Sequence, residues 1–435
     1  MLIVQPPVTG SPVPKGSVYA KSLTTLIVLI LSLPCATGHA APIDLPPTAP
    51  PPAPAHTETP PVVGGPGVGV TMTGDRFSLN VRSRIQIRYQ LEVPPENAEG
   101  ERLLQQTVNI GTARLWLSGF AFDPKFTYMI QLALAGRDYR DNASSPIFDA
   151  YVDWRAHRDL NVRAGQFFVP FDRLRTIREW GLQMPDRPRP VTEMTLDRDV
   201  GAVLYSERFL SDSSPVAWRL GAFGGGGTNL TRGKEPGVLA MGRLELRPLG
   251  PIDDDVEGDI ARRQKPGLAI GAALATNINT NRLRSTTGPT FAGGTTTYNH
   301  AAIDAVFKWR GIALQAEYLW KESSRDQILS SPMMGMPLVE YTRSGRGYVL
   351  QASYVFETPI EFVGRLTRMY ASAGTDPSFV RELERGGREV AGGINYYFNN
   401  HRFKFQADWV LRTPPSNFLG TGSDQLVHAQ LDATF

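Results

Sequence analysis

Cysteine, long apolar runs and a surplus of charge of either sign are all scarce in this chain of 435 residues. A single cysteine, Cys35, excludes a disulfide framework. The longest apolar run, residues 23–33, has eleven positions, whereas a transmembrane helix needs about 18 or more. Basic and acidic side chains nearly balance, and a nucleic-acid-binding surface would need an excess of basic ones. The sequence therefore excludes a disulfide scaffold and a helical membrane protein, and it predicts no nucleic-acid partner.

The short apolar run has instead the features of a secretory signal peptide. Lys21 precedes the run, Pro34 ends it, and small residues suited to cleavage follow. We expect residues 1–41 to be a signal peptide. Its removal takes away the only cysteine and two lysines, and it leaves 43 basic and 42 acidic side chains.

A proline-rich segment follows the expected cleavage site. Residues 42–66 contain ten prolines and almost no large apolar side chains, so they cannot bury a core. We expect a periplasmic spacer over residues 42–73, which is either a featureless linker or a tail that binds a partner. The folded domain is expected from residue 74 to residue 435.

From Arg76 onward, apolar and polar side chains alternate with a period of two, which is the pattern of strands with one apolar face. The apolar set of the first segment is Phe77, Leu79, Val81, Ile85, Ile87, Tyr89 and Leu91. Sixteen such segments lie at about residues 76–91, 107–122, 125–136, 147–156, 160–169, 199–207, 216–224, 237–247, 266–277, 298–309, 311–322, 345–356, 361–372, 388–398, 401–412 and 424–435.

An even number of strands of about ten residues, joined alternately by short turns and long loops, is typical of a transmembrane β-barrel. Hydrocarbon offers no hydrogen-bond partners, so a sheet crosses a bilayer only when it closes on itself. A soluble β-sandwich would also alternate. Aromatic residues at strand ends, arginines along the polar face and a terminal Phe435, which resembles the C-terminal aromatic residue of outer-membrane barrels, favour the barrel.

We therefore predict an all-β fold, a 16-stranded antiparallel transmembrane β-barrel with short periplasmic turns and long extracellular loops. Two connections are longer than this scheme expects of periplasmic turns, residues 208–215 and the acidic stretch 248–265. The sequence offers no explanation for the second.

Several motifs resemble those of the phosphate-selective porin O and P family. They are Ala113-Arg114-Leu115 with Ser118-Gly119, Asp149-Ala150-Tyr151-Val152, residues 162–167 with Pro170-Phe171, and Asn395-Tyr396-Tyr397-Phe398-Asn399. The resemblance covers about residues 74–435. It implies a porin in the bacterial outer membrane, surrounded by lipid and usually a homotrimer, whose third loop folds inward to the constriction. That loop is here residues 168–198.

Strand parity places a row of arginines on the inner face of the expected barrel. Guanidinium groups stay ionised and offer planar forks of donors to oxyanions, and spaced sites let an anion pass from one to the next. Arg76 shares this parity. We predict that the following arginines line the pore and bind small anions such as phosphate: Arg82, Arg84, Arg88, Arg114 and Arg163 from strands, and Arg173, Arg175 and Arg178 from the third loop.

A competing interpretation assigns the loop arginines a structural role. Acidic residues accompany them, and salt bridges between the two kinds would hold the constriction in shape. Inward acids such as Asp149 and Asp304 also predict a field across the lumen rather than a purely positive one.

The predicted function is a porin that passes small hydrophilic solutes by passive diffusion and prefers anions. Phosphate-specific relatives carry adjacent arginines where this chain has Gly111-Thr112, and the mature chain has only six lysines to gather anions. Phosphate specificity, an unselective porin and an anchoring barrel with a proline-rich tail stay open as alternatives. The chain lacks a nucleophile elbow, a P-loop and a metal-ligand motif, so we predict no enzyme, cofactor or metal.

Overall fold

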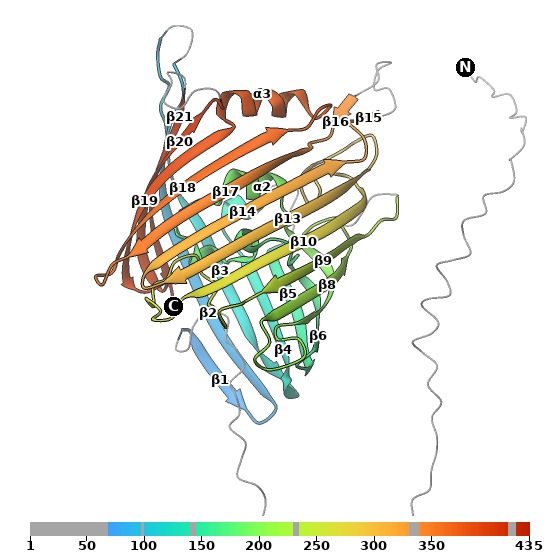
Figure 1. The fold of residues 1–435 in the computed structure, drawn as a ribbon, viewed down its shortest axis with the longest axis vertical. Coiled ribbons are helices and arrows are strands. Elements are labelled where there is room, and N and C mark those ends of the chain that lie inside the picture. The colour runs from blue at the N-terminus through green and yellow to red at the C-terminus, as the bar shows by residue number, and fades with distance from the viewer. Residues whose placement is uncertain (1–67, 97–99, 140–144, 229–234, 330–338, 416–422) are drawn as a thin grey trace, which may run out of the picture. The chain divides into compact units, whose positions relative to one another are not determined.

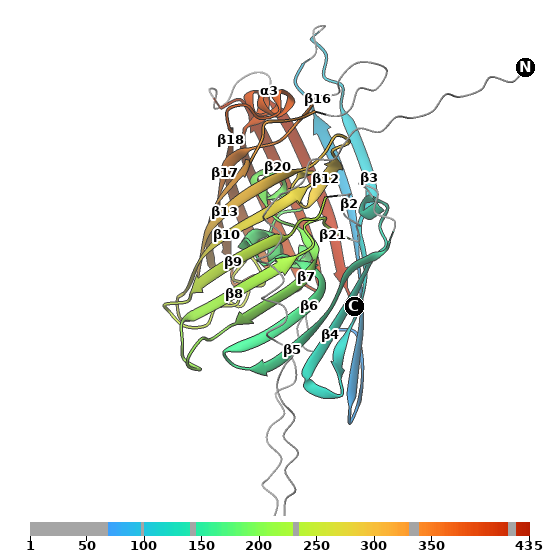
Figure 2. The same cartoon turned by 90° about the vertical axis from the view of Figure 1, so that its right-hand side faces the viewer.

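The computed structural model describes residues 68–96, 100–139, 145–228, 235–329, 339–415 and 423–435. Its strands form a closed antiparallel barrel (Figures 1 and 2). The expected signal peptide, residues 1–41, and the expected spacer up to residue 67 lie outside the described residues.

Sixteen strands close the barrel in the part of the chain that the structure describes, as predicted. They are β2 (Phe77–Val93), β3 (Gln105–Ala121), β4 (Asp123–Ala133), β5 (Ile147–His157), β6 (Leu160–Phe168), β7 (Arg198–Ser206), β8 (Val216–Phe223), β9 (Leu239–Leu246), β10 (Gly267–Thr280), β13 (Thr296–Trp309), β14 (Ile312–Ser323), β17 (Gly345–Val355), β18 (Ile360–Ala371), β19 (Arg388–Asn399), β20 (Phe403–Thr413) and β21 (Asp424–Thr434). Each overlaps one segment expected from the alternation.

The barrel closes where β2 pairs with β3 on one side and with β21 on the other. Phe435 extends this last pairing, because its backbone exchanges two hydrogen bonds with Ser83 at 2.8 and 3.0 Å. A further strand, β1 (Val70–Gly74), pairs with the first five residues of β2, on the edge that β21 leaves open. Residues 70–73 therefore belong to the sheet and not to the expected spacer.

Side chains alternate between the outer and inner faces of the barrel as the period of two predicts. Ile87 on the outer face is 51% exposed, while its neighbours Gln86 and Arg88 are buried inside. Apolar side chains on the outer face suit hydrocarbon. Arg76 is an exception to the prediction, because it lies before β2 in an exposed turn and does not face the lumen.

The remaining elements lie in the extracellular loops. They are α3 (Pro377–Gly386), η2 (Gly136–Tyr139) and two short hairpins, β11 (Arg282–Arg284) with β12 (Thr287–Thr290) and β15 (Gln327–Leu329) with β16 (Val339–Tyr341). Asp376 caps α3 by accepting from the backbone N–H of Ser378. Among the described helices, none has the length and apolar character of a membrane span.

The third extracellular loop, residues 168–198 (L3), lies inside the barrel (Figures 1 and 2). It contains α1 (Arg173–Thr176), η3 (Glu179–Gly181) and α2 (Arg189–Met194). Inward Lys404 and Gln406 of β20 hold its tip, because both donate to the carbonyl oxygen of Leu182, at 2.7 and 3.0 Å. L3 thus crosses from β6 and β7 to the opposite wall.

L3 packs an apolar face against the inner wall. Phe171, Val191 and Met194 of the loop are fully buried in a cluster with inward residues of the strands, among them Leu319 and Val349. A watery lumen would require an inner surface that is polar throughout. The inner surface of this barrel is polar only in part. Its apolar part lies where L3 covers it.

The acidic segment 248–265, at the periplasmic end between β9 and β10, also folds into the lumen. The backbone N–H of Glu257 donates to the carbonyl oxygen of Gly181 in L3 at 2.9 Å, and the Glu257 carboxylate accepts from the backbone N–H of Gln183 at 2.7 Å. Inward Lys308 of β13 donates to the carbonyl oxygens of Asp253 and Val256. This segment supports L3 from the periplasmic side, and this role explains why the segment is longer than a turn.

We predict that Phe171→Ala loosens L3 and leaves the barrel intact. Phe171 is fully buried between loop and wall, and such truncations cost about 3–5 kcal/mol. The strands keep their hydrogen bonds. We expect faster proteolysis within residues 168–198 and a larger single-channel conductance. Phe405→Ala, on the lipid-facing side, is the matched control. Equal protection of L3 in both variants would contradict the packing described here.

Candidate functional site

The lumen beneath L3 holds a cavity of about 1480 Å³. Inward residues of strands between β2 and β9 form one side, the underside of L3 forms the roof, and residues 253–263 face them. L3 and segment 248–265 both pack on the β13 to β20 side. Water-filled space is therefore concentrated on the β2 to β9 side.

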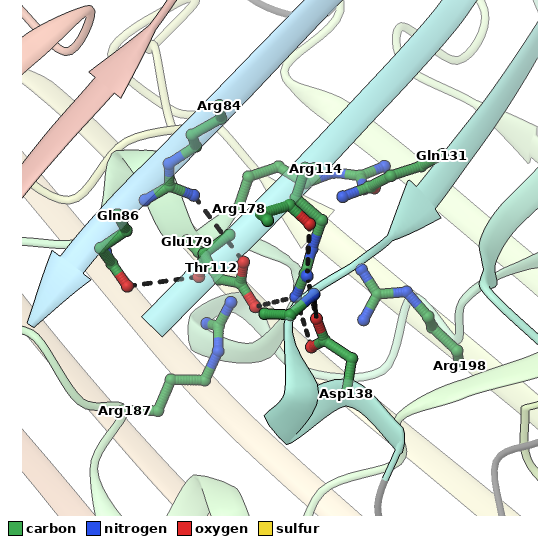
Figure 3. A network of polar contacts seen from close by, with 12 residues as sticks. Arg84, Gln86, Thr112, Arg114, Gln131, Asp138, Arg178, Glu179, Arg187 and Arg198 are labelled. Atoms are coloured by element: carbon green, nitrogen blue, oxygen red, sulfur yellow. Dashed lines mark hydrogen bonds and ion pairs between the residues drawn. The ribbon is translucent and has the colours of Figure 1, made fainter. Parts of the chain in front are cut away.

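Arg84 and Arg114 lie opposite each other on β2 and β3 and are both buried (Figure 3). Arg84 forms two hydrogen bonds with Asp432 of β21, and Arg114 forms two with Asp138 of η2. The Glu179 carboxylate of L3 lies between the two guanidinium groups, 3.7 Å from Arg84 and 3.6 Å from Arg114. Glu179 therefore bridges two arginines with loose contacts, each longer than a hydrogen bond.

A second pair of arginines shares Asp149 of β5, which is completely buried. Arg178 of L3 donates to Oδ2 of Asp149, and Arg198 at the start of β7 donates to Oδ1 at 2.8 Å. The guanidinium carbon of Arg198 also lies 3.5 Å from the ring centroid of Phe148 and 3.6 Å from that of Phe168. Two cations thus share Asp149, Arg198 also lies 3.7 Å from Asp197, and aromatic rings lie on either side of Arg198.

Three more predicted arginines face the lumen from strands. Arg88 donates to Gln430, to Asp186 and to the carbonyl oxygen of Pro185, so it fastens L3 to β2. Arg163 of β6 donates to the Asp153 carboxylate at 2.9 Å through Nε. Arg82 is buried near the periplasmic end of β2 and donates to Asn80.

The other two predicted arginines belong to a different cluster. Arg173 contacts Asp304 of β13, Glu245 of β9 and Asp254 of the periplasmic segment. Arg243 of β9 donates to the same Asp304 at 2.6 Å. Arg175 is paired with Asp197 within L3. These contacts fix L3 to the β9 and β13 wall.

All eight predicted arginines therefore face the lumen or lie in L3, and the structure brings Arg84, Arg114 and Arg178 together (Figure 3). They do not form a row of free charges. A carboxylate partner is present for Arg84, Arg88, Arg114, Arg163, Arg173, Arg175 and Arg178. These ion pairs join loop to wall, as the competing interpretation expects, and the role of the arginines in anion binding stays a prediction.

Two residues at the site were missed by sequence reasoning. Arg155 lines the cavity six positions after Asp149 on β5, and the parity that identified Asp149 would have found it. Arg198 stands at the start of β7, where L3 ends, and strand parity gives no signal there.

We define two groups by charge. The basic wall consists of seven arginines and five carboxylates, namely Arg84, Arg114, Arg155, Arg163, Arg178, Arg187 and Arg198 with Asp138, Asp149, Asp153, Glu179 and Asp432. The acidic wall consists of eight carboxylates and four cations, namely Asp172, Glu245, Asp253, Asp254, Asp255, Glu257, Asp304 and Glu317 with Arg173, Arg243, Arg247 and Lys308. Net positive charge thus gathers along β2 to β7, and net negative charge along β9 to β14 and in segment 248–265.

Arg187 completes the basic wall from L3. Its guanidinium donates to the carbonyl oxygens of Leu174 and Ile177, at the end of α1. Burial lowers the pKa of Arg187 to about 10, so it stays a cation at neutral pH. It has no carboxylate within ion-pair distance among the described residues.

The comparisons with known proteins identify the family. A family model described as phosphate-selective porin O and P matches residues 79–417, most of the chain. This chain belongs to the phosphate-selective porin O and P family. The described motifs of strands β3, β5 and β6 all lie within the matched part. No functionally curated protein matches the chain.

Solved outer-membrane channels share the fold of this porin. OmpF of Salmonella typhi, in complex with daunomycin, has a TM-score of 0.54 at 13% identity, covering 84% of this chain and 100% of that one. The outer membrane channel DcaP of Acinetobacter baumannii has a TM-score of 0.51 at 12% identity, covering 85% and 100%. Family and fold together make this chain an outer-membrane channel of the bacterial envelope.

We predict that the stability of packed L3 depends on pH through Asp172. Its carboxylate joins the two ends of the loop, because it accepts from the backbone N–H of Arg175 and from the hydroxyl of Thr195. Burial raises the pKa of Asp172 to about 6, against the opposing charges of Arg175 and Arg243 and beside Glu317. The packed loop therefore binds a proton that the opened loop releases between about pH 4 and pH 6.

Stability of the packed loop should consequently fall as the pH rises through this window. We expect L3 amides to be about tenfold less protected from hydrogen exchange at pH 7 than at pH 5, after correction for intrinsic rates. Asp172→Asn should abolish the difference, because the amide does not titrate. The same dependence in the variant would assign it to another group.

Proposed function

We propose that this outer-membrane channel passes small hydrophilic solutes by passive diffusion and prefers anions. The observation that supports this most is the surplus of basic side chains around the cavity, whose lining includes twelve arginines and Lys308 against nine carboxylates. Paired arginines still attract anions when they outnumber their carboxylates, because the local potential follows the net charge. Spaced guanidinium forks along the wall would hold an oxyanion briefly at each step.

Among anions, we propose general passage rather than specificity for phosphate. At the position where phosphate-specific relatives carry adjacent arginines, this chain has Gly111 and Thr112. The Thr112 hydroxyl donates to Gln86 at 3.2 Å, so two neutral side chains occupy that part of the lumen. Small anions such as phosphate are then substrates among others. The homotrimer is also a proposal, tested by the mass of the purified complex in detergent.

The decisive measurement is the reversal potential of the reconstituted protein across a potassium chloride gradient in a planar bilayer. An anion-signed potential supports the proposal, and stepwise block by low phosphate would show phosphate specificity. A reversal potential near zero indicates an unselective porin. Without discrete conductance steps, an anchoring barrel with the segment 42–66 as its tail becomes the better interpretation.

We predict that Glu179→Gln increases anion preference. Glu179 lies between Arg84 and Arg114, so removing its charge adds one positive charge to the basic wall, while Arg84 keeps Asp432 and Arg114 keeps Asp138 as partners. We expect the ratio of chloride to potassium permeability to rise about twofold. Glu384→Gln removes the same charge from an exposed position on α3 and should leave the ratio unchanged. An equal shift in both variants would place selectivity at the surface.

A further inference from the structure

Aromatic rings face the cavity on the wall formed by β5, β6 and β7. Tyr151, Phe167 and Tyr205 all line it, although inward positions of a diffusion channel are expected to be polar. The rings of Tyr151 and Phe167 meet edge to face, with centroids 5.7 Å apart. Phe167 and Tyr205 are buried, at 2% and 9% exposed, whereas Tyr151 is partly exposed, so L3 leaves the ring of Tyr151 accessible from the open cavity.

Arg163 lies at the centre of the three rings. Its guanidinium carbon is 4.5 Å from the ring centroid of Tyr151, 5.6 Å from that of Phe167 and 5.8 Å from that of Tyr205. Nε and Nη2 donate to Asp153, whereas Nη1 donates to no described residue. A third of the side chain, 33%, is exposed. One fork of this guanidinium is therefore available to a ligand, with aromatic surface beside it.

Arg155 provides a second cation next to this group. It follows Asp153 by two positions on β5, so both side chains face the lumen, and Asp153 pairs in register with Arg163. Arg155 is half-buried, lines the cavity and forms no hydrogen bond or ion pair through its side chain with any described residue. Asp153 thus pairs with Arg163, and Arg155 adds a second guanidinium group beside them.

We propose that these residues, the aromatic-arginine wall (Tyr151, Arg155, Arg163, Phe167 and Tyr205), bind small aromatic carboxylates in transit. The ligand carboxylate would accept from the free donors of Arg155 and Arg163, and its ring would contact Tyr151, which packs on the buried ring of Phe167. This inference rests on the proposed anion preference and names the class of anion that gains most from the wall.

The chemistry separates this ligand class from inorganic anions. Chloride and phosphate interact with guanidinium groups. They gain nothing from aromatic surface, because they would have to lose water of hydration to contact it. A benzoate ring removes its own apolar area and that of the wall from water, and ring pairs and cation-π contacts add to this. The cavity of about 1480 Å³ is much larger than such a ligand, so binding is weak enough to permit release.

The test uses the mature chain in a planar bilayer and compares the concentrations of benzoate, acetate and phosphate that halve the potassium chloride current. We expect benzoate to block at about a tenfold lower concentration than acetate. Equal block by benzoate and acetate would overturn the proposal. It would leave the proposed anion preference intact, because the reversal potential measures that preference separately.

Variants distinguish the contributions of ring and charge. Tyr151→Leu keeps an apolar side chain without a ring and should reduce the preference for benzoate over acetate to about twofold, with acetate unaffected. Arg155→Gln, which breaks no hydrogen bond or ion pair among the described residues, should weaken block by both carboxylates. It keeps the test decisive if Tyr151→Leu does not fold. Arg208→Gln removes the same charge at the exposed periplasmic mouth and should leave block by both carboxylates unchanged. Block weakened equally by Arg208→Gln and Arg155→Gln would assign the effect to overall charge and reject the wall.

Discussion

This whole structure depends on one constraint, which is that a backbone in hydrocarbon needs hydrogen-bond partners within the protein. The sheet must close, and β2 therefore pairs with β21 across more than 300 intervening residues. Closure in turn assigns every second side chain to the lumen. The arginines, the carboxylates and the aromatic rings of the site lie together because of that assignment.

The lumen is filled unevenly, and its function follows from this unevenness. L3 and segment 248–265 occupy the side of β13 to β20, where apolar contacts and buried polar bonds hold them. What is left open is bordered by side chains of both charges, with basic ones in excess, and by the aromatic rings. The salt bridges that position L3 thus involve largely the same residues that we propose attract anions, and Arg178 belongs to both sets.

Strand parity was sufficient to predict the sixteen strands and the inward direction of Arg84, Arg88 and Arg114, because a period of two is a local property of the chain. Strand parity could not identify the partners of these residues. Asp432 is 348 positions from Arg84, and Asp138 lies in an extracellular loop. The path of L3 and the inward fold of segment 248–265 depend on tertiary contacts with inward residues such as Lys308 and Lys404, for which no periodic signal exists.

The short strand β1 bears on how the seam of the barrel is aligned. On the same edge of β2, Val70 pairs with Val81 and the backbone of Phe435 with Ser83, so only Arg82 separates the two neighbours. If β21 slipped by two residues toward the periplasm, its end would collide with β1. The hairpin therefore acts as a stop that sets the stagger of the closing strands, and through it the tilt and the diameter of the channel.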